Sequence, residues 1–342
     1  MDDADASLST FEWTPPSAGV ATPAPDESLA ERLASIADDR GLGGDEVARR
    51  TARECHAWLC EEECGDDGVR EALFAGLEGV AAAHGWRGPV AGLLAALGAV
   101  AEEPAGEGPE RREALATECA AWTETPETIA GPEWNGALEP PALRLPDRSA
   151  CAAPLLEGPL ALEPGEIVVV HGWSETVARG LELARARGLA PTAIVSEGGP
   201  DLGGRRLARR LAAGGITVRF VYDAALQDAV RAADRVWIGT EAIGARGFLG
   251  RIGARALLES AGELDVQRIV LATSDKLVPG GELACPEWAA NEPWHLWEGA
   301  PSGVDVQSQS YEIVPQELVD GFATELGLLR PADLAVQALR LV

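Results

Sequence analysis

Apolar residues in the first part of the chain recur at intervals of three and four positions. This spacing is found in LAERLASIADD, VREALFAGLEGVAAAHG, VAGLLAALGAVAEE and GPERREALATECAAWTE, and it is the period of an amphipathic helix. We therefore expect a helical domain over residues 27–125. The preceding residues 1–26 are rich in Asp, Ser, Thr and Pro. Such a composition does not offset its own ordering entropy, so it predicts a flexible tail.

The pattern changes after a proline-rich stretch, residues 126–160, which marks a predicted connection between two domains. From residue 161 onward, short β-branched runs alternate with helical stretches. The runs are IVVV, TAIVS, TVRFVYD, RVWIG and RIVLAT, and the helical stretches are ETVARGLELARARG, GRRLARRLAAGG, ALQDAVRAA and GRIGARALLESAGE. Strands joined by crossover helices form a parallel sheet, because only a crossover returns the chain in the same direction. Residues 161–342 are thus predicted to form an open, parallel α/β domain.

The net charge of the chain disfavours some classes of binding partner. The chain has 55 acidic and 28 basic residues and a formal charge of -27, which would repel nucleic acid and anionic lipid. We expect no direct nucleic-acid partner and no membrane partner. Lys276 is the only lysine, and hydrated carboxylates with few ammonium groups suit a cytoplasm of molar salt. A halophilic microbial source is predicted; a GC-rich genome would explain the arginine excess but not the acidity.

The cysteines and the apolar runs bear on the cellular compartment. The six cysteines lack the dense, even spacing of a secreted disulfide scaffold, so reduced thiols are expected. No signal stretch opens the chain, and the longest apolar runs are too short to span a bilayer. These features predict a cytoplasmic protein.

Several polar residues follow the predicted strands, and ligands of open parallel sheets bind at the carboxyl ends of the strands. His171 precedes a predicted helix whose free N–H groups would receive an anion; the alternative is a histidine satisfied by hydrogen bonds. Lys276 would hold a phosphate or pair with a buried carboxylate, or it is a chance retention on a loop. The residues predicted at this edge are His171, Ser174, Glu197, Asp223, Glu241 and Lys276.

Three of these residues are carboxylates. Glu197, Asp223 and Glu241 each follow a strand, and if they converge in one crevice they push one another's pKa values apart. The alternative is that each acid caps the next helix. Both interpretations remain open from the sequence.

Other candidate motifs are weak. His56, Cys60 and Cys64 lie at helical i, i+4 and i+8 spacing and have zinc-binding side chains. This spacing is not a familiar zinc motif, and cysteines are often buried simply by packing. The glycine-rich GGPDLGG and GARGFLGRIG match neither the dinucleotide fingerprint nor the P-loop, and no G-x-S-x-G elbow is present. We predict no metal and no cofactor.

The second half of the chain resembles a known family. It contains, in order, IVVVHGWSETV, AIVSEGGPDLGGRRLARRL, VRFVYDAAL, RVWIGTEAIGARGFLGRIGARAL, LATSDKL and YEIVPQELVDGFATELGLLRP. In order and spacing these segments are similar to the translation initiation factor 2B family over roughly residues 160–335. The resemblance implies an N-terminal α-helical domain followed by a Rossmann-like, doubly wound parallel sheet domain. It also implies pairing of copies through the α/β domain.

The family includes regulatory subunits and sugar-phosphate isomerases, and this chain departs from the isomerases. The resemblance places their catalytic cysteine and aspartate at Gly172 and Glu241. Moving a proton between adjacent carbons needs an acid–base pair. Glycine supplies no such group, and glutamate is one methylene longer than aspartate. The site therefore looks impaired for isomerisation.

The residues at the family's phosphate-binding site are also altered in this chain. Gly199 stands where a phosphate-contacting arginine is usual, and Gly250 and Ala254 flank Arg251-Ile-Gly where Asn and Thr are usual. Arg251 is the cation of this motif that remains, and we include it among the predicted ligand residues.

The resemblance is strongest to the alpha-type regulatory subunit, because of the glutamate in GTEAI and the PDLGGRRLA segment. We predict a non-catalytic subunit that forms a homodimer or higher homo-oligomer and acts with initiation factor 2 subunits. Its expected small-molecule ligand is a sugar phosphate or nucleoside monophosphate. The alternative is a divergent isomerase in which Glu241 and Asp223 replace the usual pair. A third possibility is a metabolite sensor with no translational role.

Overall fold

The computed structural model describes residues 27–39, 44–61, 68–85, 87–102, 108–123, 148–157, 160–278, 281–283 and 296–333. The predicted tail and most of the predicted 126–160 connection lie outside these ranges. Within the ranges, none of the helices combines the length and the apolar character needed to cross a bilayer.

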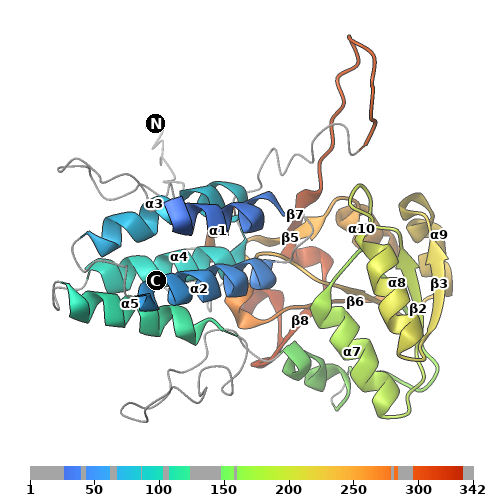
Figure 1. Ribbon diagram of the computed structural model, residues 1–342. Helices are drawn as coiled ribbons and strands as arrows, with labels where there is room; N and C mark the ends of the chain where they lie inside the picture. The colour runs from blue at the N-terminus through green and yellow to red at the C-terminus, as the bar shows by residue number, and fades with distance from the viewer. Residues whose placement is uncertain are drawn as a thin grey trace, which may run out of the picture.

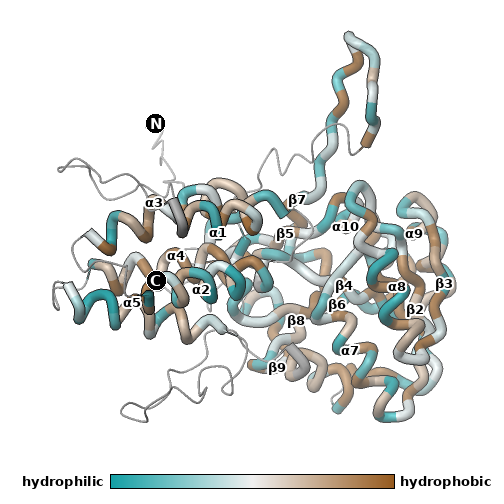
Figure 2. The backbone as a smooth tube through the Cα atoms, viewed as in Figure 1, coloured by the Kyte–Doolittle hydropathy of each residue, from teal (hydrophilic) through white to brown (hydrophobic). Residues whose placement is uncertain are grey.

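The helical domain follows the predicted pattern. Its described helices are α1 (Glu27–Asp38), α2 (Gly44–Cys60), α3 (Val69–His84), α4 (Gly88–Glu102) and α5 (Pro109–Ala121). Helix α1 packs on α3, and α2 packs on α4 and α5. Their apolar stripes form one core that includes the nearly buried rings of Trp58 and Trp122. These helices lie together at one end of the molecule, with apolar and polar positions alternating along them (Figures 1 and 2).

The second domain is built on a seven-stranded sheet with strand order β3-β2-β1-β4-β6-β8-β9. Neighbouring strands are parallel except that β9 is antiparallel to β8. The predicted α/β class, with a helical domain before a doubly wound sheet, is therefore confirmed. The strands are β1 (Ile167–Val170), β2 (Thr192–Ser196), β3 (Thr217–Val221), β4 (Arg235–Ile238), β6 (Gln267–Leu271), β8 (Gly321–Thr324) and β9 (Gly327–Leu329).

Helices cover both faces of this sheet. Val168 and Val170 of β1 point into a core shared with α7 (Glu175–Ala186) and α8 (Gly203–Ala213). Val169 points the opposite way, into a core shared with α9 (Leu226–Ala229) and α10 (Ala254–Glu263). Since adjacent residues of one strand are buried on opposite faces, the continuous apolar run IVVV is explained by a sheet covered on both sides.

Two predicted helices needed correction. The stretch GRIGARALLESAGE was expected to be helical throughout, but Gly250 and Arg251 belong to β5 (Gly247–Arg251), and the helix begins only at Ala254. Strand β5 pairs antiparallel with β7 (Tyr311–Pro315), about 60 residues away, so no local periodicity could reveal it. In ALQDAVRAA the α-helix is confined to α9, and a 3-10 turn over Val230–Ala232 follows it.

The two domains meet at the carboxyl ends of β4 and β6. The N–H of Gly88, the first residue of α4, donates to the carbonyl oxygen of Glu241 at 2.9 Å. An added Cβ on Gly88 would lie 2.7 Å from the carbonyl oxygen of Lys276, in the 3-10 turn η4 (Ser274–Lys276) after β6. Helix α4 therefore begins in direct contact with the loops that carry the predicted ligand residues.

Candidate functional site

His171 lies at the end of β1 and is almost fully buried, with 4% of its surface exposed. Its Nε2 is 2.7 Å from the carbonyl oxygen of Ile252, and its Nδ1 is 2.7 Å from the hydroxyl of Ser196. Burial lowers the pKa of His171, although the Ile252 carbonyl and Asp223 act in the opposite direction. The imidazole is therefore neutral at pH 7 and donates from Nε2 to Ile252, because a carbonyl oxygen only accepts.

Asp223 follows β3 and binds the backbone of the loop after β2. Its carboxylate accepts hydrogen bonds from the N–H groups of Gly198 and Gly199, at 2.8 and 2.7 Å. One oxygen also lies 3.7 Å from His171 Nδ1. Burial alone would raise the pKa of Asp223, but the two glycine N–H groups, Ser196 and His171 together lower it. Asp223 is thus an ionised group that fixes the loop between β2 and α8.

Arg251 ends β5 and reaches the same loop. Its guanidinium pairs with Asp201 and lies 5.2 Å from the ring centroid of Tyr311. The Nε is buried and has no hydrogen-bond partner within the described ranges. An added Cβ on Gly172 would lie 3.4 Å from this Nε. One donor of a buried cation therefore faces Gly172 without a partner.

Gly172 has a positive φ of 70°. A residue with a side chain adopts this conformation at a cost of roughly 1–2 kcal/mol. The chain therefore holds a glycine where the family resemblance places the catalytic cysteine, in a backbone conformation that glycine suits.

Glu241 has a different set of direct partners, although Arg251 lies near enough to help lower its pKa. One of its carboxylate oxygens lies 3.5 Å from Lys276 Nζ and accepts the N–H of Gly44, the first residue of α2, at 2.8 Å. The Glu241 and Lys276 side chains are only 19% and 7% exposed. Burial alone would raise the pKa of Glu241, but Lys276, Arg87 and the Gly44 N–H outweigh it, and the pKa is lowered. We call Glu241, Lys276, Arg87 and Gly44 the interdomain clamp.

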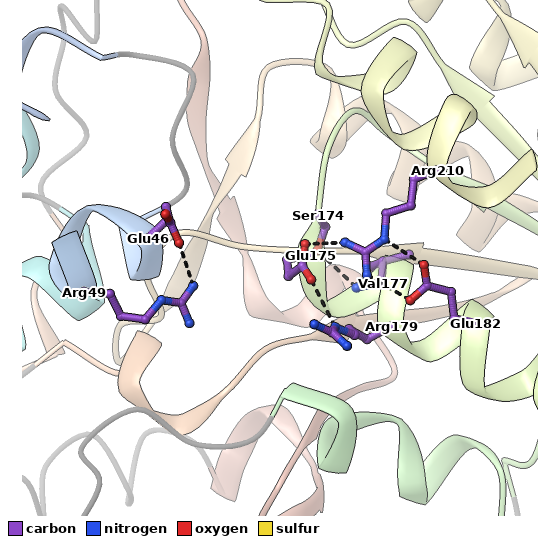
Figure 3. Close-up of polar contacts among 8 residues, drawn as sticks. All are labelled: Glu46, Arg49, Ser174, Glu175, Val177, Arg179, Glu182 and Arg210. Carbon is purple, nitrogen blue, oxygen red and sulfur yellow. Dashed lines mark hydrogen bonds and ion pairs between the residues drawn. The ribbon is translucent and has the colours of Figure 1, made fainter. Parts of the chain in front are cut away.

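Ser174 and Glu197 have local partners. Ser174 is the N-cap of α7, and its hydroxyl accepts the N–H of Val177 at 3.3 Å. Glu197 lies 3.5 Å from Arg205 on α8. Figure 3 shows the Ser174 cap beside a network in which Arg210 joins Glu175 and Glu182.

The predicted ligand residues thus separate into groups by their direct contacts, and Arg251 of the first group also acts on the charge of Glu241 in the second. His171, Asp223 and Arg251 gather around the loop after β2, whereas Glu241 and Lys276 belong to the interdomain clamp. Within the described part of the chain, no hydrogen bond or ion pair joins Glu197, Asp223 and Glu241 to one another. The sequence did not indicate four partners that complete these groups: Ser196, Asp201, Gly44 and Arg87. Asp201 and Ser196 flank a strand end and could have been included on that ground, but no local signal marks Gly44 or Arg87.

The weak candidate set of His56, Cys60 and Cys64 lies only partly within the described residues. Cys60 Sγ lies 3.5 Å from His56 Nδ1 near the end of α2, but Cys64 lies outside the described ranges. Among the residues that the structure describes, no group of three or more His, Cys, Asp or Glu side chains is placed to hold a metal ion.

Comparison with known proteins identifies the family to which this α/β domain belongs. The model of the Initiation factor 2 subunit family matches residues 150–331, which is just over half of the chain. The chain belongs to that family.

Two relatives and one solved structure show how far the similarity extends. Ribose 1,5-bisphosphate isomerase of Thermococcus kodakarensis is 26% identical over 186 residues, which are 51% of this chain and 56% of that protein. Methylthioribose-1-phosphate isomerase of Klebsiella pneumoniae is 28% identical over 236 residues, 62% of this chain and 69% of that protein. The translation initiation factor eIF-2B of Pyrococcus horikoshii has a TM-score of 0.70 at 19% identity, covering 90% of this chain and 98% of its own.

The chain matches only part of the length of some of these proteins. The chain spans only 56% of the length of the first of these relatives, and an identity of 19% concerns the fold alone. The family and the fold are therefore established.

Proposed function

We propose that this chain is a non-catalytic, regulatory subunit of the initiation factor 2B type, which acts by binding protein partners in translation initiation. The observation that carries the proposal is the interdomain clamp. The carboxylate at the position of the isomerases' aspartate, Glu241, contacts Lys276 and the Gly44 N–H. Because its pKa is lowered, it is a weak proton acceptor at neutral pH.

Gly172 gives independent support. The resemblance to the isomerases places the second catalytic group at the position after His171, and Gly172 has no side chain there. His171 itself has both ring nitrogens engaged by Ser196 and Ile252. The usual acid–base pair is thus missing one member, and the other member is part of the clamp.

A phosphorylated small molecule fits this account as a bound ligand. The buried Arg251 Nε faces Gly172 without a hydrogen-bond partner in the described residues, and an arginine donor suits a phosphate oxygen. Asp201 already pairs with the same guanidinium, so bound phosphate would compete with a carboxylate of the chain itself. We therefore propose weak binding of a sugar phosphate or nucleoside monophosphate, without turnover.

Complex formation tests the regulatory role. The full chain, mixed with purified initiation factor 2 subunits from the same source, is analysed by size-exclusion chromatography with light scattering. We expect a co-migrating complex whose mass exceeds that of either component, and we expect the chain alone to migrate as a dimer or larger homo-oligomer. Separate migration at every concentration would overturn the proposed translational role.

The second candidate is a divergent isomerase, which is favoured by the isomerase relatives named above. In that case Glu241 and Asp223 would act as the acid–base pair. Against this, Asp223 is held by the Gly198 and Gly199 N–H groups and shares no described contact with Glu241. Turnover of either named sugar phosphate distinguishes the two candidates.

A further inference from the structure

Helix α8 has an unusual charge for this chain. It contains Arg205, Arg206, Arg209 and Arg210 and no carboxylate, in a protein whose formal charge is -27. Arg210 is joined to Glu175 and Glu182, and Arg205 lies 3.5 Å from Glu197. Arg206 and Arg209 are exposed, and no carboxylate of the described residues pairs with either. The outer face of α8 therefore presents uncompensated positive charge.

Trp173 holds one of these arginines in place. The Arg206 guanidinium carbon lies 4.0 Å from the centroid of the Trp173 ring, within the range of a cation–π contact. Trp173 itself packs over Gly203, where an added Cβ would lie 2.8 Å from the Trp173 Cβ. A guanidinium stacked in this way loses less side-chain entropy when it binds a partner than a free one does. Arg206 is therefore pre-positioned at the surface.

Strand β3 borders α8 and forms one edge of the sheet. It pairs with β2 on one side, and no strand of the described residues pairs with its other side. Such an edge presents unpaired backbone N–H and C=O groups. At its end, Phe220 is 48% exposed and Tyr222 is 74% exposed. Open backbone groups and large apolar side chains therefore occur at the same edge.

The arginines and the aromatic residues lie at the same end of this edge. Helix α8 connects two parallel strands, so it runs antiparallel to them, and its N-terminal half lies near the carboxyl end of β3. Val218 packs in the core that contains α8, and by strand alternation Phe220 points to the same face. Figure 1 shows α8 beside β2 and β3 at the margin of the molecule. We call Arg205, Arg206, Arg209, Phe220 and Tyr222, with the open strand, the β3 edge surface.

We infer that the β3 edge surface binds an extended, acidic segment of a protein partner, which adds a strand to β3. Open edges accept such segments through backbone hydrogen bonds, and arginine and aromatic side chains are the usual anchors of protein interfaces. The inference rests on the proposed role as a partner-binding subunit and names the surface and the chemistry of the partner.

The positive charge of β3 and α8 favours an acidic segment as the partner over a second copy of this chain. A two-fold axis centred on the five-residue strand β3 would place Arg219, its middle residue, opposite Arg219 of the other copy. Like charges directly opposite each other destabilise a strand pair. An acidic segment instead places its carboxylates on the Phe220 face, against the arginines of α8, and leaves Arg219 on the opposite face without a like charge beside it.

Two short fluorescein-labelled peptides test the inference, one alternating Glu and Val and the other alternating Lys and Val. Anisotropy titrations use the full chain at one fixed potassium chloride concentration. We expect the acidic peptide to bind at least about tenfold more tightly than the basic one. The double variant Arg206→Glu/Arg209→Glu should weaken the acidic peptide by about tenfold or more. N-methylation of alternate peptide amides should also weaken it, because strand addition needs those N–H groups.

The matched control is Arg187→Glu/Arg330→Glu, which changes the net charge equally at exposed arginines outside α8. It should leave peptide affinity within about twofold, since distant surface charges are screened. Far-UV circular dichroism of each variant establishes that the fold is retained.

Three outcomes overturn the inference. The first is equal binding of the two peptides or equal affinity of the two double variants. The second is self-association that Phe220→Asp abolishes, which assigns the edge to a second copy. The third is binding of poly-uridine with the same dependence on Arg206 and Arg209. If the chain turns over a sugar phosphate and still binds the acidic peptide, the proposed function is overturned and the inference about the β3 edge surface stands. If the chain neither turns over a sugar phosphate nor binds the peptide, the inference about the surface is overturned and the proposed function stands.

Discussion

Glu241 is the residue on which the functional interpretation depends. Its position follows a strand end, as the sequence indicated, but the direction of its side chain is set by α2 and by Lys276. The sequence offered two roles for Lys276, phosphate binding or pairing with a buried carboxylate, and the structure places it 3.5 Å from Glu241. This partner comes from η4, after β6, and sequence periodicity contains no information on such a contact.

Replacing Glu241 with Gln tests the clamp. The variant removes the negative charge that faces Lys276 and Arg87, and we expect the free energy of unfolding to fall by about 1–3 kcal/mol, because breaking a largely buried ion pair is destabilising. Glu259→Gln is the control, since Glu259 is 53% exposed in its pair with Arg255, and it should cost less than about 0.5 kcal/mol. Urea unfolding measures both; equal values would contradict the clamp.

The same variant has a pH signature. The pKa of Glu241 is lower in the folded chain than its ordinary value of 4.5. Its ionised form therefore stabilises the fold above pH 4.5 and loses that contribution as pH falls through the lower, folded-state pKa. The stability difference between the native chain and Glu241→Gln should be constant near neutrality and shrink below pH 4.5. A difference that grows on acidification would contradict this assignment.

At the scale of elements, the helices and the parallel strands were predictable, and their contacts were not. The continuous apolar run IVVV indicated a buried strand, and both faces of β1 are indeed covered. Strand β5 was missed, because its partner β7 lies far along the chain and the two-stranded ladder leaves only a short, glycine-containing run. The docking of α4 on η4 was also invisible, because it depends on a missing side chain at Gly88.

Gly88→Ala tests this docking, with Gly98→Ala in the same helix as its control. An added methyl at Gly88 would lie 2.7 and 2.8 Å from backbone atoms of Lys276, which cannot move aside as a side chain can. We expect a loss of about 1–3 kcal/mol from overpacking. Gly98 has open space around it, so alanine there should stabilise α4 by about 0.5–1 kcal/mol. Thermal unfolding of both variants measures the two effects, and stabilisation by both would contradict the docking.

At the scale of the whole molecule, the acidic composition predicts how stability depends on salt. A formal charge of -27 makes the folded chain repel itself at low ionic strength, and salt screens that repulsion. We expect the free energy of unfolding to rise as potassium chloride increases toward molar concentration. Denaturation in urea, which is uncharged, measures this without adding salt. A maximum of stability at low salt would contradict the predicted adaptation.

Family membership and the order of elements could be read from the sequence, because the motifs of the second half follow one another on consecutive strands and loops. The state of the site could not. Gly172 was recognisable as a departure, but whether Glu241 faces a ligand or the helical domain depends on Gly44 and Arg87, which are remote in sequence. The proposed regulatory role therefore rests on this long-range arrangement.

The most direct test of the proposed role is turnover. The full chain, in molar potassium chloride, is incubated with ribose 1,5-bisphosphate and with methylthioribose 1-phosphate, and ketose formation is followed by NMR beside Glu241→Gln and Glu259→Gln. The account predicts no ketose above the protein-free control for any of the three proteins. Ketose formed by the native chain and by Glu259→Gln, but not by Glu241→Gln, would show that Glu241 is a catalytic group and would contradict the account.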